Sequence, residues 1–252
     1  MLRELGFAGL ELGESDAADA EPAMRRDQLA GHGLTLWSVS PDCAGQHLLD
    51  ARDPADYLAR FRAGCALALA LGAHAVRIDT VQPPAIHRAD DYRDLLARLV
   101  RAWDRCIGLA GDLGLAVAWE PRPDRAFNKP ADVQRVLERL QQDRFGVRYD
   151  TGHAQALAVL GIGQEGPRET LRGGQAELVA RLAGRIGEIV IADCDEAADL
   201  VAPGEGTLPL AELAGALAAA APEVEWWGVA PPAPDALAPA KTVLDGLIGQ
   251  TQ

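Results

Sequence analysis

Short apolar runs alternate with longer amphipathic segments along the whole chain. Seven of the runs are rich in Val, Ile and Leu, which is typical of strands buried on both faces of a sheet. The predicted strands span residues 7–12, 34–40, 73–80, 115–120, 147–150, 188–193 and 224–230. No linker or change of composition interrupts this alternation in the sequence.

The segments between these runs carry apolar residues at helical spacing. The predicted helices cover residues 21–32, 53–71, 89–113, 130–140, 175–182, 210–220 and 236–247. Asp53 is predicted as an N-cap and Pro54 as the first helical residue after it. Gly114 is predicted to end the longest helix, and Gly6 to end a helical segment that opens the chain.

Strands that alternate with helices in this way predict a parallel sheet covered by helices. The predicted fold class is α/β, a (β/α)8 TIM-type barrel that forms a single domain over residues 1–252. Seven strands are predicted and the chain opens on a helical segment, so the first strand is expected to be lacking or replaced. Either the barrel is open or patched there, or the start codon was placed too late. An open strand edge invites a partner, which favours a homo-oligomer.

The composition restricts the classes of function. Hydrophobic residues make up 48% and charged residues 24%, an ordinary globular balance, and the net charge is −13. This acidity argues against nucleic acid as a partner, which would need a basic face. No apolar run approaches the ~18 residues of a membrane span, so no membrane is expected. Four widely spaced cysteines and no recognisable signal peptide predict reduced thiols and a cytoplasmic protein. The cysteines are Cys43, Cys65, Cys106 and Cys194.

Two predicted strands end in a carboxylate. Glu120 ends the strand 115–120, and Asp150 ends the strand 147–150. The carboxyl ends of parallel strands share one rim, so the two side chains are expected to converge on a pocket for a metal, a sugar or both. Carboxylates suit Mg²⁺ or Mn²⁺, and with a histidine also Zn²⁺ or Co²⁺. The alternative for Glu120 is that it caps a loop or pairs with Arg122 or Arg125.

His153 lies three residues after Asp150, in a loop or on the first turn of the next helix. It is a candidate metal ligand, proton shuttle or hydrogen-bond donor to a sugar hydroxyl. The alternative is a loop histidine that is satisfied by a backbone carbonyl.

Further candidates for substrate contact lie at the same predicted rim. Arg77 and Asp79 share one face of their strand, where they form either an internal salt bridge or a pair that grips an oxyanion or hydroxyl. Arg122 follows Glu120, and Asp193 ends a later strand and faces either the pocket or a solvated acidic loop.

In the order and spacing of its short motifs, the chain resembles the sugar phosphate isomerase/epimerase superfamily, the xylose isomerase-like TIM barrels. The motifs that carry the resemblance are Leu5–Leu12, Gly33-Leu34 leading to Trp37, Trp119-Glu120-Pro121, Asp150-Thr151-Gly152-His153, residues 173–187 and Gly204-Glu205-Gly206. The resemblance implies a divalent metal (Mn, Mg, Co or Zn) held by Glu, Asp, His and a final acid. It also implies that carboxylates move a proton between adjacent carbons of a sugar-like substrate.

Two of the four implied ligands match and two do not. Glu120 and Asp150 stand at the first two ligand positions, whereas Val190 stands at the histidine position and Ala230 at the final acid. Neither valine nor alanine binds a cation. Substitute ligands would have to come from Glu188, His153, Asp193 or Asp195.

Two hypotheses follow. In the first, the chain is a sugar isomerase or epimerase that acts on a small polyhydroxy carbonyl compound at a divalent metal, with Glu120 and His153 as catalytic residues. In the second, it is a degenerate barrel that has lost the metal. That barrel either has altered lyase or isomerase chemistry or is a non-catalytic partner for a ligand or another subunit. Substrate specificity is expected in the loops 83–89 and 124–129.

Overall fold

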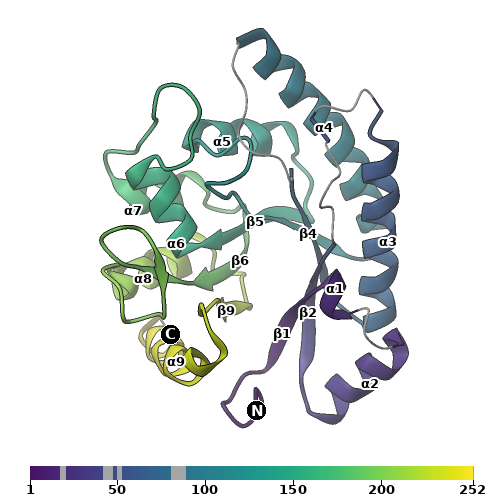
Figure 1. Cartoon of the computed structure of the whole chain (residues 1–252), viewed down its shortest axis with the longest axis vertical. Coiled ribbons are helices and arrows are strands. Elements are labelled where there is room, and N and C mark those ends of the chain that lie inside the picture. Colours follow the sequence, from purple (N-terminus) through teal and green to yellow (C-terminus); the bar gives the residue numbers. More distant parts are fainter. Residues whose placement is uncertain (18–20, 42–47, 50–52, 81–88, 252) are drawn as a thin grey trace. The chain divides into compact units, whose positions relative to one another are not determined.

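The computed structural model describes residues 1–17, 21–41, 48–49, 53–80 and 89–251 (Figure 1). Cys43 and nearly all of the predicted specificity loop 83–89 lie outside the described residues. Side chains of residues 89 and 90 are also outside the description.

All seven predicted strands are present. Their bounds are β1 Gly9–Gly13, β2 Thr35–Ser40, β3 Ala75–Ile78, β4 Ala116–Trp119, β5 Phe145–Asp150, β6 Ile186–Ile191 and β9 Trp227–Val229. The strands form one sheet in the order β1-β2-β3-β4-β5-β6-β9, and the pairings that have a described register are parallel. A separate antiparallel pair joins β7 (Asp193–Cys194) to β8 (Leu200–Val201).

The predicted helices are confirmed as well, and none of their ends shifts by more than four residues. The longer helices are α2 Pro22–Gly31, α3 Ala55–Leu71, α4 Ala89–Asp112, α5 Pro130–Arg139, α7 Gly174–Arg181, α8 Leu210–Ala220 and α9 Leu237–Thr251. Four short elements were not predicted as separate: α1 Glu14–Ala17, α6 Thr151–Ala154, a π-helix at Gln155–Leu160 and a 3-10 turn at Pro234–Ala236. The fold is therefore the predicted α/β fold of the TIM-barrel type, with seven parallel strands in the described part of the chain.

Backbone contacts divide the chain into two compact units. Unit 1 comprises residues 1–120 and 136–146, and unit 2 comprises residues 121–135 and 147–252. Strand β5 begins in unit 1 and continues in unit 2. The single domain expected for residues 1–252 stays a prediction.

The core of unit 1 lies where α3 and α4 pack beside strands β2 to β4 (Figure 1). Trp103 of α4 and Trp119 of β4 are fully buried with ring centroids 5.3 Å apart. Phe145 closes the same cluster, 6.2 Å from Trp103. This aromatic cluster anchors the end of β4, which carries Glu120.

Gly114 ends a helix where the sequence predicts it, whereas the helical segment predicted before Gly6 is only a turn over residues 2–6. Gly6 has a φ of 86°, and the N–H groups of Gly6 and Phe7 donate to the carbonyls of Arg3 and Leu2, the pattern of a Schellman turn. Gly114 ends α4 with a φ of 77°.

The predicted start of α3 differs by one residue. Pro54, not Asp53, occupies the N-cap position, although the Asp53 carboxylate still accepts the N–H of Ala55 at 3.0 Å. The capping bond was therefore predicted correctly, and its position in the helix was wrong by one residue.

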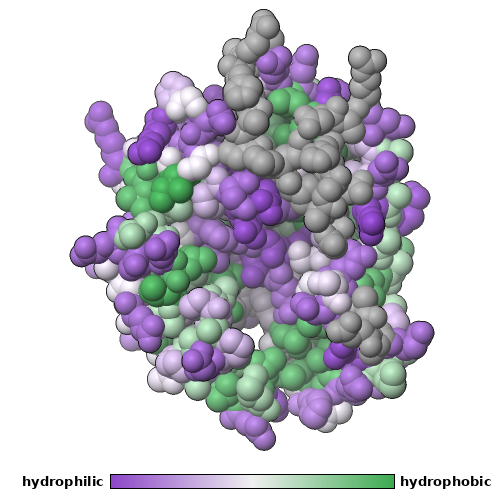
Figure 2. Space-filling model, in the orientation of Figure 1, coloured by the Kyte–Doolittle hydropathy of each residue, from purple (hydrophilic) through white to green (hydrophobic). Residues whose placement is uncertain are grey.

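The surface mixes polar and apolar residues on the face that Figure 2 draws. Among described residues, the exposed large apolar side chains include Leu160, Ile162 and Leu200, which lie in unit 2. Within the same described part, every helix is too short or too polar to cross a bilayer.

Candidate functional site

Glu120 lies directly after β4 and is 4% exposed. Its carboxylate forms an ion pair with the guanidinium of Arg77, which comes from the neighbouring strand β3. Arg77 Nη1 also lies 2.9 Å from Glu11 Oε1, on β1. Glu120 thus has a cationic partner that is 43 residues away in sequence, and the sequence did not suggest this pair.

The strand register explains how an arginine fits inside unit 1. Ser38 is paired with Ala75, and Arg77 is paired with Ala118. Residues two apart point to the same face of a strand, so Ala75 and Arg77 share a face, and Ala118 shares that face with Glu120. The small side chains of Ser38, Ala75 and Ala118 are buried and leave room for the guanidinium.

The charges around Arg77 do not cancel. Burial by itself lowers the pKa of the Arg77 guanidinium, but Glu120 and Glu11 outweigh burial, and with Asp79 they raise that pKa above its usual value. One guanidinium faces two carboxylates in direct ion pairs. The Arg77 cluster, defined as Glu11, Arg77 and Glu120, therefore keeps a net negative charge.

The sequence left two roles for Arg77 and Asp79, an internal salt bridge or a pair that grips a ligand. Arg77 forms ion pairs with Glu11 and Glu120, which the sequence did not suggest as its partners. Asp79 Oδ1 accepts the N–H of Thr80 at 2.6 Å, and its backbone carbonyl accepts the hydroxyl of Tyr57 at 2.5 Å. The charge of Asp79 also raises the pKa of the Arg77 guanidinium.

In unit 2, the arginines that follow Glu120 lie beside another acid. Arg122 Nε is 3.1 Å from Asp124 Oδ1, and Arg125 also pairs with Asp124. Arg122 and Asp124 have partly exposed side chains, at 34% and 50%. Arg122 is thus accessible to a ligand only in competition with Asp124.

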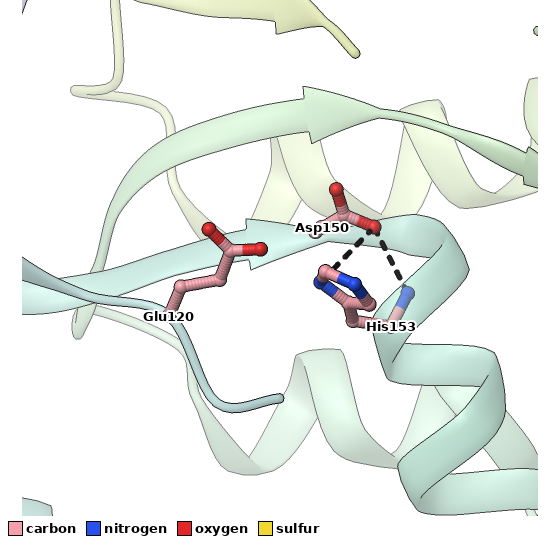
Figure 3. A group of neighbouring side chains, drawn as sticks. All are labelled: Glu120, Asp150 and His153. Atoms are coloured by element: carbon pink, nitrogen blue, oxygen red, sulfur yellow. Dashed lines mark hydrogen bonds and ion pairs between the residues drawn. The ribbon is translucent and has the colours of Figure 1, made fainter. Parts of the chain in front are cut away.

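Asp150 ends β5 and is the N-cap of α6. Its Oδ1 accepts the backbone N–H of His153 at 2.9 Å, a bond that Figure 3 shows as a dashed line. The ring of His153 is turned to the same oxygen, with Nδ1 3.9 Å away. The predicted place of His153 on the first turn of a helix is confirmed, and the cap explains why an aspartate and a histidine at this spacing lie together.

The opposite face of β5 is held by a buried polar chain. The hydroxyl of Tyr149 donates to Gln175 at 3.0 Å, and Gln175 in turn donates to Gln155 at 3.1 Å. Burial raises the pKa of the Tyr149 phenol, and the charge of Asp150 raises it further. Tyr149 is therefore a neutral donor that fixes the strand end carrying Asp150.

The residues level with Asp150 on the next strands have no metal-binding atoms. Asp150 is paired with Val190 on β6, and Val190 is paired with Gly228 on β9. Ala230, the position expected from the family motif, follows the end of β9 and is exposed. β6 and β9 thus contribute no side-chain donor at the level of Asp150.

Two of the proposed substitute ligands have structural partners. Glu188 is 2% exposed and lies 3.4 Å from Arg148, its register partner on β5 and one layer below Asp150. Asp195 accepts the N–H groups of Ala197 and Asp199 and so forms a turn.

Asp193 is neither in a solvated loop nor open to a ligand, because it is 1% exposed. Four backbone N–H groups donate to its oxygens at 2.9 to 3.1 Å, from Cys194, Gly204, Gly206 and Leu208. A Cβ at Gly206 would collide with the Asp193 carboxylate. Asp193 therefore organises the Gly204-Glu205-Gly206 turn, a role that the sequence did not reveal.

Unit 2 also contains a hollow of about 340 Å³, open space included. Its walls include Val147, Val133, Leu157, Leu178 and Leu182, with Asp150 and Arg148 among the few polar groups. A mainly apolar lining offers a polyhydroxy compound few partners. The rim residues, rather than this hollow, are the better candidates for a sugar.

The comparisons with known proteins agree with the fold. A family model described as xylose isomerase-like TIM barrel matches residues 1–244. No protein of curated function matches the sequence.

Three solved structures illustrate the likeness. An L-ribulose 3-epimerase has a TM-score of 0.76 at 16% identity and covers 99% of this chain and 86% of its own. A D-tagatose 3-epimerase-like protein has a TM-score of 0.80 at 13% identity, with 99% and 91% covered. The IOLI protein with a binding zinc atom has a TM-score of 0.72 at 14% identity, with 99% and 90% covered.

Proposed function

This chain belongs to the xylose isomerase-like TIM barrel family, and we propose that it is a sugar isomerase or epimerase acting on a small polyhydroxy carbonyl compound. The observation that carries the proposal is the retention of two buried carboxylates, Glu120 and Asp150, directly after β4 and at the end of β5. Burying a carboxylate is costly, and these two strands are neighbours in the sheet order. The likeness to an L-ribulose 3-epimerase and to a D-tagatose 3-epimerase-like protein supports the substrate class.

We further propose that Glu120, Asp150 and His153 hold a divalent cation. All three are residue types that bind metals, and each is buried or half-buried. Two carboxylates and an imidazole suit Zn²⁺, Co²⁺ or Mn²⁺. With no donor at Val190 or Gly228, the remaining positions around the cation would be filled by water or by oxygens of the substrate.

In this proposal each residue has a separate role. A bound cation supplies a Lewis acid that polarises the substrate carbonyl and acidifies the adjacent C–H. Glu120 takes the α-proton and returns it, and His153 donates a hydrogen bond to a hydroxyl of the substrate. Arg77, Asp79 and Arg122 stay predicted substrate contacts. Asp193 is not carried further, because backbone amides surround its oxygens. The cytoplasmic location and the homo-oligomer also stay predictions.

A second candidate is a metal-free barrel. The observation in its favour is that Glu120 already has a cationic partner in Arg77, while β6 and β9 have no donor level with Asp150. Such a protein either moves the proton without a metal or binds a ligand without turnover.

Metal titration of the full chain separates the two candidates. After treatment with a chelator, saturation with Mn²⁺, Co²⁺ or Zn²⁺ at about 100 times the dissociation constant should stabilise the protein by about 2.7 kcal/mol. Glu120→Gln and Asp150→Asn should each abolish this gain. Asp245→Asn, which removes an exposed acid paired with Lys241, is the matched control and should retain it.

The absence of a gain with all three ions would rule out the metal-dependent function. Exchange of the substrate α-proton with D₂O, followed by NMR over a panel of ketoses, then distinguishes the remaining alternatives. Exchange in chelated protein identifies a metal-free enzyme, and no exchange identifies a non-catalytic barrel.

A further inference from the structure

Arg77 has a position that its predicted role in substrate contact does not explain. We propose that Arg77 is a positioning residue that competes with a divalent cation for Glu120 and so sets the metal affinity of the site. This inference rests on the metal site put forward under the proposed function. It assigns to Arg77 a regulatory role in which the guanidinium acts as a built-in counter-cation.

Arg77 contacts two carboxylates at once. Both terminal nitrogens of its guanidinium are used, Nη1 by Glu11 and Nη2 by Glu120. The side chain is only 14% exposed, and that of Glu120 only 5%. A guanidinium held at two corners by separate strands has little freedom to move away from Glu120.

The Arg77 cluster has an excess of negative charge. The Arg77 cluster contains two carboxylates and one guanidinium, and Asp79 adds a further negative field at Arg77. Without Arg77, the half-buried Glu11 and the buried Glu120 would lose the guanidinium that they share. The same excess of negative charge attracts a divalent ion, which would have Arg77 as a close like-charged neighbour.

The arginine on β5 provides a contrast. Arg148 lies 3.4 Å from Glu188 on β6, and this pair is one layer away from Asp150 along the strands. Glu188 is not one of the two family-type ligands. Arg77, in contrast, contacts the proposed metal ligand Glu120 directly.

The sign of the effect distinguishes competition from structural support. A partner that merely orients a metal ligand strengthens metal binding, and its removal typically weakens affinity about 10- to 100-fold. Competition predicts the opposite. Removal of the guanidinium should tighten metal binding by a factor of about 10 or more, because Glu120 loses a bound competitor and the cation loses a positive neighbour.

The test is isothermal titration calorimetry of the chelator-treated full chain with Mn²⁺ and Co²⁺. Arg77→Gln is compared with the wild type and with Arg101→Gln, which removes the same charge from an exposed position on α4 of the same unit. We expect tighter binding in Arg77→Gln and no change in Arg101→Gln. Arg77→Lys keeps the positive charge but cannot contact Glu11 and Glu120 through two separate nitrogens. The metal affinity of Arg77→Lys should therefore lie between those of the wild type and Arg77→Gln.

If Arg77→Gln does not fold, the metal affinity of Arg77→Lys is compared with that of the wild type. Tighter binding by Arg77→Lys supports competition. Unchanged or weaker binding in the variants, with binding in the wild type, would overturn the role of Arg77 and leave the proposed function intact. Binding by Arg77→Gln alone would support competition and favour the metal-free candidate for the natural chain. If neither wild type nor variants bind either ion, the metal site and the role of Arg77 both fail.

Discussion

The two units hold their strand-end carboxylates in different ways. In unit 1, Glu120 is bound by the guanidinium of Arg77, a long-range ion pair between neighbouring strands. In unit 2, Asp150 and Asp193 are bound by backbone N–H groups close in sequence. At these strand ends, a guanidinium balances Glu120, and peptide N–H groups donate to Asp150 and Asp193.

This difference bears on function. A backbone N–H that donates to a carboxylate carries only a partial positive charge. A carboxylate that is paired with a buried arginine must share its oxygens with a full positive charge. The availability of Glu120 as a metal ligand therefore depends on a second residue, Arg77.

The largest expected effect follows from removing the cation of unit 1. Arg77→Met should lower the free energy of unfolding by about 3–5 kcal/mol, because the buried Glu120 and the half-buried Glu11 both lose their guanidinium. Urea denaturation followed by circular dichroism measures the loss. In the background Glu11→Gln/Glu120→Gln, the same Arg77→Met change should cost much less, which a mutant cycle shows directly. An equal cost in both backgrounds would mean that Arg77 stabilises unit 1 through packing alone.

An intermediate effect is expected where backbone amides hold an acid. Asp193→Ala should cost about 3 kcal/mol, since four backbone N–H groups lose their acceptor in a buried place. Hydrogen exchange should show faster exchange at Gly204, Gly206 and Leu208. Asp195→Ala, in the partly exposed turn nearby, is the control and should cost well under about 1 kcal/mol. Equal losses in the two variants would contradict the assignment of Asp193 as the structural acid.

The smallest effect is expected at Asp150. Asp150→Ala removes the N-cap of α6 and should cost about 1 kcal/mol, whereas Asp150→Asn, which keeps a capping oxygen, should cost a few tenths of a kcal/mol. Thermal unfolding of the two variants without metal measures both values. A loss for Asp150→Asn as large as that for Arg77→Met would mean that Asp150 also depends on a buried cation.

The sequence by itself determined the elements and the chemical types at the rim. Apolar periodicity located all seven strands, and glycines located the ends of the helices they follow. The spacing of Asp150 and His153 placed both on one capped turn. These features are local, because strand and helix periods and caps depend on residues only a few positions apart.

Only the tertiary structure decided which groups meet. Arg77 pairs with Glu11 and Glu120, because the parallel register sets Arg77 between β1 and β4 on a face lined by small residues. Gly228, not Ala230, is level with Val190 on β9. A one-residue shift in register turns every side chain to the other face, and periodicity within one strand carries no information about that register. The partner of Glu120, and with it the metal affinity of the proposed site, therefore depends on how neighbouring strands pair and not on the sequence of any one strand.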